Sequence, residues 1–277
     1  MPNALILGSN TAVGAYLARL LHARGTAVFG VASPGGGDGI TALGIADSVN
    51  AIGFAVAIDL AARLPDATLF AVNSGDPTTA EQAAELYAAA SADARLCHIA
   101  DADALRQSPL LLDQARAIAA LRRDHGRRAV NAILHAHDSR LGPADGLPAR
   151  ITLAAWRAAN GWAPATPLAL VETGPRDWGW TAEYVDAIAR LAALDRPIDL
   201  AIGSGHRIDT GTMVNEAFGF FKLRPEGHVT VSPGAAVTEP DIDTARLKAA
   251  TGWSASTWGR DLVHALCEGA AARAADQ

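Results

Sequence analysis

The N-terminal segment sets the tightest limit on what this chain can fold into. A short apolar run, Ala4–Leu7, is followed by a glycine-bounded turn, Gly8–Gly14, and then by an Ala/Leu-rich stretch, Ala15–Arg24, that Gly25 ends. The order strand, glycine turn, helix is typical of a βαβ unit, whose turn lets the backbone approach a ligand's phosphates. We therefore expect a parallel sheet with a nucleotide site at its first turn.

Short β-branched or apolar runs alternate with longer periodic stretches along the rest of the chain, which predicts more βαβ units. The predicted strands lie at 27–31, 42–45, 68–72, 95–99, 129–134, 168–171 and 198–202. The predicted helices lie at 48–64, 79–90, 110–124, 151–160, 182–193, 212–220 and 258–271. This pattern predicts an α/β fold, a Rossmann-type doubly wound parallel sheet with a small C-terminal α/β lobe.

Composition excludes several classes of protein. With 23 basic and 29 acidic residues the net charge is −6, so no basic surface is expected for a nucleic-acid partner. The two cysteines, Cys97 and Cys267, are too far apart in sequence to suggest a disulfide framework or a zinc site, and no metal is expected. No apolar run is long enough for a membrane span. A cytoplasmic protein is the expectation.

The glycine turn supplies the first candidate site. Its expected cofactor contacts are Gly8, Ser9, Asn10, Thr11, Val13 and Gly14. Thr11 stands where the usual fingerprint has its middle glycine, so a tight turn without a ligand remains an alternative. The second strand ends in 31–33, which has neither an acid for a ribose hydroxyl nor an arginine for a 2′-phosphate, so the choice between NAD and NADP stays open.

Further segments carry a family resemblance, and most of them lie in the second half. They are 15–21, 28–30, 123–126, 132–134, 137–139, 150–151, 176–179, 183–187, 202–206, 216–218 and 243–253. The most specific is the Arg-Asp-Trp-Gly block at 176–179, followed by Tyr184 and Val185. With these segments the chain resembles the extended short-chain dehydrogenase/reductases, most closely the GDP-mannose 4,6-dehydratases.

The resemblance implies NADP or NAD bound on residues 1–140, a nucleotide-binding core to which later segments return. It implies a nucleotide sugar like GDP-mannose on residues 141–277, mainly a substrate-binding lobe. Asn73, Ser74 and His137 match family positions near the cofactor. The family's reaction oxidises the sugar at C4, removes water across C5 and C6, and returns the hydride.

The reaction needs a tyrosine base and a lysine four residues later. At the matching positions this chain has Leu110 and Gln114. Its only lysines, Lys222 and Lys248, follow none of its three tyrosines at that spacing, so no other alignment restores the pair. The standard hydride-transfer residues are therefore missing.

Other side chains are candidates for acid and base work. Asp103 matches a family glutamate, and the alternative is a solvated carboxylate on a polar loop. His135 and His137, at i and i+2, are expected on one strand and so on one face, as catalytic groups or as a hydrogen-bonded cluster.

Three residues are expected to contact the nucleotide sugar. Arg176 matches a family arginine, and a guanidinium binds a diphosphate through two hydrogen bonds. A salt bridge to Asp177 is its alternative role. Arg150 replaces a family lysine, and Glu239 is retained from a family stretch near the end.

Three hypotheses follow. The chain is a nucleotide-sugar and NAD(P)-binding protein of this family without the hydride cycle, or a redox-neutral lyase or isomerase that uses Asp103, His135 or His137. The third is a non-catalytic partner of an active dehydratase. If it is active, we expect a lyase-like enzyme with a non-standard active site. The apolar helix 110–124 predicts a homodimer or a hetero-oligomer.

Overall fold

The computed structural model describes residues 2–73, 75–162, 164, 166–235 and 239–275. The chain divides into two compact units. Unit 1 holds 1–135, 181–202 and 243–254, and unit 2 holds 136–180, 203–242 and 255–277.

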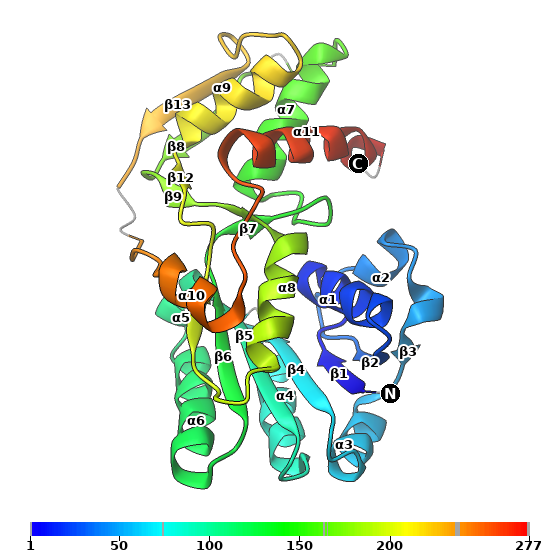
Figure 1. The fold of residues 1–277 in the computed structure, drawn as a ribbon. Coiled ribbons are helices and arrows are strands. Elements are labelled where there is room, and N and C mark those ends of the chain that lie inside the picture. The colour runs from blue at the N-terminus through cyan, green and yellow to red at the C-terminus, as the bar shows by residue number, and fades with distance from the viewer. Residues whose placement is uncertain (1, 74, 163, 165, 236–238, 276–277) are drawn as a thin grey trace. The chain divides into compact units, whose positions relative to one another are not determined.

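Unit 1 contains a seven-stranded sheet (Figure 1). In spatial order its strands are β11 (Leu200–Ile202), β6 (Ala129–Leu134), β5 (Arg95–Asp101), β4 (Thr68–Asn73), β1 (Asn3–Leu7), β2 (Ala27–Val31) and β3 (Asn50–Ala51). Every pair of neighbours is parallel. The order changes direction between β1 and β4, so the predicted doubly wound α/β fold is confirmed.

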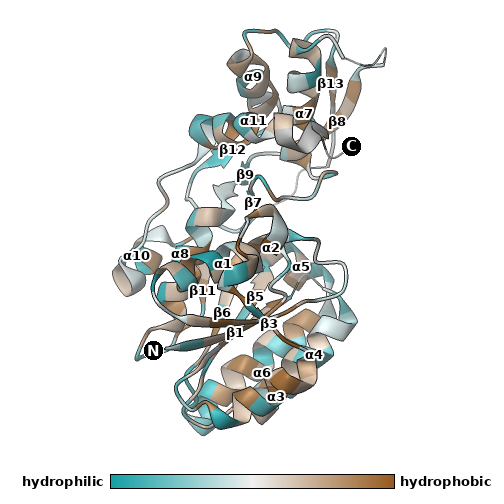
Figure 2. Ribbon diagram, turned by 90° about the vertical axis from the view of Figure 1, so that its right-hand side faces the viewer, coloured by the Kyte–Doolittle hydropathy of each residue, from teal (hydrophilic) through white to brown (hydrophobic). Residues whose placement is uncertain are grey.

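Helices cover both faces of this sheet (Figure 2). One face carries α1 (Ala12–Ala23) and α8 (Thr181–Ala192), and the other carries α3 (Phe54–Arg63), α4 (Pro77–Ala89) and α6 (Pro109–His125). The unit's shorter helical segments are α2 (Gly39–Ala42), η1 (Ala46–Ser48), α5 (Ala102–Gln107) and α10 (Thr244–Thr251).

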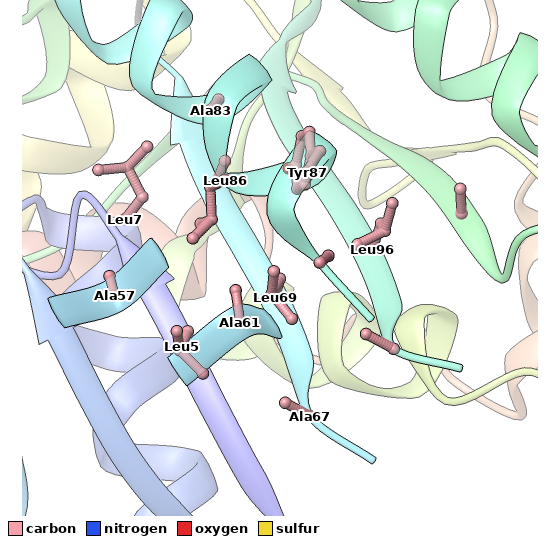
Figure 3. Close-up of a cluster of buried hydrophobic side chains, with 14 of the residues drawn as sticks. Leu5, Leu7, Ala57, Ala61, Ala67, Leu69, Ala83, Leu86, Tyr87 and Leu96 are labelled. Carbon is pink, nitrogen blue, oxygen red and sulfur yellow. The ribbon is translucent and has the colours of Figure 1, made fainter. Parts of the chain in front are cut away.

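The core of unit 1 lies between the sheet and the helices α3, α4 and α6. Leu5, Leu69 and Leu96 of three adjacent strands are buried against small residues of α3 and α4, among them Ala61 and Ala83 (Figure 3). Alanines at these helix positions let the helices approach the sheet closely, which buries the strand side chains completely.

Unit 2 packs three helices around its own core. They are α7 (Leu147–Ala159), α9 (Thr210–Phe220) and α11 (Gly259–Ala275). Its strands pair in twos: β8 (Leu168–Glu172) with β13 (Val229–Pro233), β7 (His137–Asp138) with β10 (Gly179–Trp180), and β9 (Arg176–Asp177) with β12 (Arg207–Ile208). Phe218 and Ile151 are fully buried where the helices meet.

Two predicted elements are wrong. The strand expected at 42–45 is absent, because α2 occupies 39–42 and Gly44 has a φ of +63°. The helix expected from 48 begins at Phe54, since β3 (Asn50–Ala51) pairs with β2 and Gly53 precedes the helix as its N-cap.

Two kinds of feature are absent from the part of the chain that the structure describes. None of its helices combines the length and the apolar character that spanning a membrane requires. No group of three or more histidine, cysteine or acidic side chains in that part is arranged to hold a metal ion.

Candidate functional site

The glycine turn of unit 1 has the backbone shape of a dinucleotide-binding turn. Gly8 has a φ of +83°, which favours glycine, and a Cβ added at Gly14 would lie 2.0 Å from the carbonyl oxygen of Gly8. Helix α1 therefore starts in direct contact with the end of β1. Ser9 and Val13 are buried beside the turn. Two of the predicted contact glycines are required by packing, whether or not a ligand binds.

Thr11, at the position of the missing glycine, is the N-cap residue of α1. Its hydroxyl accepts a hydrogen bond from the N–H of Gly14 at 3.0 Å and donates to the carbonyl of Gly8 at 2.8 Å. The chain's own side chain thus engages one of the N–H groups at the helix start, where a phosphate would bind.

Asn10 joins the turn to the loop that follows β2. Its Nδ2 donates to the carbonyls of Ser33 and Gly37, at 3.0 and 3.2 Å, and its Oδ1 accepts from the N–H of Ser33 at 2.8 Å. The Asn10 carbonyl also accepts from the N–H of Gly39 at 3.0 Å. The loop 33–39 is therefore bonded to the turn at both of its ends.

The positions that the resemblance assigns to the family's tyrosine and lysine lie on α6. Leu110 is 41% exposed. Gln114 accepts from Nδ2 of Asn73 at 2.8 Å and donates through Nε2 to the carbonyl of Ala80. The structure thus brings two of the predicted positions together, and Asn73 donates a hydrogen bond to Gln114. Ser74 lies outside the described residues.

The three acid and base candidates are placed differently from the prediction. Asp103 lies on α5 rather than on a loop, and it forms an ion pair with Arg106 one turn later. His135 is buried, and its N–H donates to the carbonyl of Ile202 at 2.9 Å. His137 belongs to β7 of unit 2.

The expectation that His135 and His137 share one strand is wrong. Strand β6 ends at Leu134, the register partner of Ile202, and Ile202 is the last residue of β11. Beyond that point β6 has lost its neighbour on that side. His137 pairs instead with Gly179 in a separate two-stranded sheet.

His98, which lies within strand β5 of the seven-stranded sheet, was not predicted as a site residue. It is 1% exposed on β5 beside Asn131 of β6, and neither ring nitrogen has a hydrogen-bond partner among the described residues. Burial lowers the pKa of His98 to about 4, although the negative charge of Asp199 acts in the opposite direction.

Asp199, the residue before β11, binds helix α6 through Arg122. Its carboxylate receives two hydrogen bonds from Arg122, at 2.6 and 2.7 Å, and a third from the N–H of Asn131 at 2.7 Å. Burial raises the pKa of Asp199, but these hydrogen bonds outweigh burial and hold the pKa below its usual value.

In unit 2 the structure brings Arg176 and Glu239 together. The guanidinium lies 3.5 Å from Oε1 of Glu239, whose side chain is almost fully buried, and 5.6 Å from the ring of Trp178. The other oxygen of Glu239 accepts from the N–H of Asp177 at 2.8 Å. Two of the three predicted substrate residues thus form one ion pair.

Asp177 fixes the segment that follows β11. Its carboxylate accepts from the N–H and the hydroxyl of Ser204, at 2.9 and 2.7 Å, and from the N–H of Gly205 at 2.6 Å. This buried carboxylate ties β9 to the chain around Ser204, so the position of Arg176 is rigidly supported.

Arg150 lines a hollow of about 480 Å³ between α7 and the chain that enters β8. Arg157, seven residues later on the same face of α7, also lines it, together with the apolar side chains of Leu153 and Leu168. Sequence reasoning missed Arg157, although its i, i+7 spacing from Arg150 on a helix was a usable signal. The hollow suits an anion with an apolar part.

A smaller hollow, about 310 Å³, lies between α4 and α6. It is mostly apolar, with Tyr87, Ile118 and Leu121 among its lining residues, and Leu112 on α6 is 40% exposed.

Comparison with solved structures finds the same fold. A dTDP-glucose 4,6-dehydratase from Bacillus anthracis in complex with NAD has a TM-score of 0.80 at 9% identity, over 97% of this chain and 96% of that one. A UDP-glucose 4-epimerase from Stenotrophomonas maltophila with bound NAD has a TM-score of 0.73 at 15% identity, over 99% of each chain. The protein RMD from Pseudomonas aeruginosa, complexed with NADPH, has a TM-score of 0.70 at 14% identity, over 99% and 100%.

No curated protein sequence matches this chain. The sequence profile of the GDP-mannose 4,6 dehydratase family, in contrast, matches residues 114–265, which is more than half of the chain. The match begins at Gln114 within α6 and includes Arg150, Arg176 and Glu239. On that match, the chain belongs to the GDP-mannose 4,6 dehydratase family of the extended short-chain dehydrogenases/reductases.

Proposed function

We propose that this protein binds a nucleotide sugar of the GDP-mannose kind, and NAD or NADP, without running the family's hydride cycle. The observation that carries the proposal is Gln114. At the lysine position Gln114 has a neutral amide, which bonds to Asn73 and to the carbonyl of Ala80. It therefore offers no ammonium to a ribose or to a phenol. Leu110, at the tyrosine position, has no proton to transfer.

Support for nucleotide-sugar binding comes from unit 2. Arg176 is held beside Glu239 and Trp178, and Arg150 and Arg157 line one hollow. Guanidinium groups at concave sites bind diphosphates through paired hydrogen bonds. The relatives of known structure include epimerases and dehydratases of nucleotide sugars.

The fit of the implied dinucleotide is uneven. Gly8 and Gly14 give the turn the backbone shape that receives a pyrophosphate, and α1 begins directly behind it. Bound NAD or NADP would supply a hydride acceptor there. At the other end, the chain has neither the base nor the lysine that the acceptor needs, so we derive no oxidation step.

The test is a titration of the purified protein with GDP-mannose, GDP, NADP and NAD by calorimetry, followed by incubation of GDP-mannose with each cofactor. We expect binding of the nucleotide sugar, no reduced nicotinamide and no 4-keto sugar. Formation of a 4-keto sugar would contradict the loss of the hydride cycle, and failure of GDP and GDP-mannose to bind would contradict nucleotide-sugar recognition.

Arg150→Ala tests the binding residue. Within the part of the chain that the structure describes, its side chain bonds only to the carbonyl of Ala169, so its removal leaves the fold intact. We expect at least a tenfold loss of GDP-mannose affinity, about 1.4 kcal/mol. Arg224→Ala, an exposed arginine of the same unit, is the matched control and should leave the affinity unchanged.

A role as a partner of another subunit has its own support. The apolar hollow between α4 and α6, with Leu110 and Leu112 exposed nearby, suits packing of these helices against a second copy or a related chain. Ala117→Glu would place a charge in that hollow. If the hollow is an interface, sedimentation analysis should show a dimer that this substitution dissociates; a monomeric parent protein would contradict the self-association.

The redox-neutral alternative has less support. Asp103 is engaged by Arg106, and Asp103 and His135 belong to unit 1 whereas His137 belongs to unit 2. A reaction rate whose pH dependence follows the pKa of a histidine or an aspartate would support this alternative.

A further inference from the structure

We infer that the loop 33–39 closes the dinucleotide-binding turn and that the side chain of Asn10 holds it closed. The inference rests on the proposed function, because it names what controls the access of NAD or NADP to unit 1. It follows from contacts within the first βαβ unit.

The side chain of Asn10 forms its hydrogen bonds with the loop. The amide donates twice and accepts once, and all three partners are backbone groups of Ser33 and Gly37. The backbone carbonyl of Asn10 holds the N–H of Gly39 as well. A single residue of the turn therefore fixes the beginning, the middle and the end of the loop.

The loop also lies in direct contact with the turn and with the start of α1. A Cβ added at Gly36 would lie 2.6 Å from Oδ1 of Asn10, and one added at Gly39 would lie 2.8 Å from Cβ of Ala15. Gly35 and Gly37 have φ values of +69° and +81°. The glycines of the loop thus have two uses: they allow its sharp path, and they let its inner side rest directly on the turn.

The loop follows the second strand of the first βαβ unit, where a ligand contact is expected. In dinucleotide-binding βαβ units, a side chain near the end of the second strand, about 20 residues after the glycine turn, holds the adenosine ribose. Here β2 ends at Val31, and Ser33, two residues later, has both its N–H and its carbonyl bonded to the Asn10 amide. The amide thus holds this segment against the turn, so a dinucleotide binds only after the loop has been released from Asn10.

The apparent affinity of a ligand falls in proportion to the fraction of protein that is open. Asn10→Ala removes the three side-chain hydrogen bonds and leaves the turn glycines unchanged. We expect NADP or NAD to bind at least tenfold more tightly to the variant than to the parent protein, which corresponds to about 1.4 kcal/mol. Without any ligand, amide hydrogen exchange across 33–39 should accelerate.

Two variants guard the interpretation. Asn50→Ala removes a single amide-to-carbonyl bond, to Val28, elsewhere in the same unit, and it should change neither the affinity nor the exchange of 33–39. Gly36→Ala leaves Asn10 in place but pushes the loop away from it, so it should reproduce the effects of Asn10→Ala.

The outcomes separate the closed loop from the proposed function. Equal NAD(P) affinity in the parent protein and in both loop variants, or unchanged exchange in Asn10→Ala, would overturn the inference. Failure of every variant to bind NAD or NADP would overturn it too, and would also remove dinucleotide binding from the proposed function. Binding of GDP-mannose by unit 2 residues is measured separately and does not depend on this result.

Discussion

The two ends of the family's cofactor site have fared differently in this protein. At the start of α1 the glycine turn is kept, because Gly14 has no room for a side chain against the carbonyl of Gly8. On α6, Leu110 and Gln114 stand at the positions that the family resemblance assigns to the tyrosine and lysine, and the helix packs on the sheet. The turn is set by close backbone packing, whereas the start of α6 is set by side-chain contacts such as that of Gln114 with Asn73.

The difference shows how a retained motif should be interpreted. A glycine that the fold itself requires persists with or without a ligand, so its presence says little about binding. No close backbone contact dictates the residue type at the start of α6, where Gln114 bonds to Asn73 and to the carbonyl of Ala80, so the residues found there say more about chemistry than the turn glycines do. The loss on α6 is therefore the stronger functional signal.

Gly14→Ala should produce the largest effect. Its Cβ would meet backbone atoms of Gly8 and Ser9 that cannot move without shifting β1, so we expect a loss of about 4 kcal/mol of unfolding free energy. Urea denaturation measures it. Gly219→Ala in α9, where a Cβ meets nothing within 4 Å, should instead stabilise by about 0.5–1 kcal/mol. A well-folded Gly14→Ala protein would break the comparison, since the turn would then be free to change.

Acid should weaken the α6 side of the sheet through His98. Its pKa of about 4 lies below the unfolded value of about 6.5. The unfolded chain therefore takes up a proton first as the pH falls, and stability that is complete above about pH 6.5 declines by roughly 3 kcal/mol toward pH 4. Urea denaturation across this range should show the decline, and His98→Leu should flatten it. The exposed His22→Leu is the control, and a slope unaltered in His98→Leu would exclude His98 as the source.

Gln114→Ala should have a smaller effect. It leaves Nδ2 of the buried Asn73 without its acceptor, and we expect a cost of about 2 kcal/mol in thermal or chemical unfolding. Gln107→Ala, at an exposed position at the end of α5, should stay within about 0.5 kcal/mol. Equal stability of the two variants would mean that Gln114 is not part of the packing of unit 1.

Thr11→Gly should have the smallest effect on stability and the clearest effect on the turn. Replacing an N-cap threonine by glycine costs a few tenths of a kcal/mol, whereas Thr11→Ala costs about 1 kcal/mol. Because the N–H of Gly14 is released, the glycine variant should bind NADP more tightly than the parent in a calorimetric titration. Weaker binding by Thr11→Gly would show that the threonine hydroxyl helps to hold the ligand.

Most strands of the sheet could be predicted from the sequence, whereas their order in space came from the structure. Strand β6 has the predicted bounds, and the helices α4, α6 and α8 differ from the predictions by one or two residues. Apolar periodicity is a local property, so it indicates these elements reliably. The short elements β3 and α2 could not be predicted in this way. Strand β3 depends on pairing with β2, and α2 depends on the contacts of the preceding loop, and a local pattern contains neither.

By itself the sequence determined the absence of a tyrosine followed four residues later by a lysine, because neither of the two lysines lies at that spacing after any of the three tyrosines. Only the tertiary structure decided what took its place. Asn73 and Gln114 are 41 residues apart, Asn10 and Ser33 are 23, and Asp177 and Glu239 are 62. Such partners meet because strand order and crossovers bring their elements together, and the energy of each contact depends on a burial that no local pattern reveals.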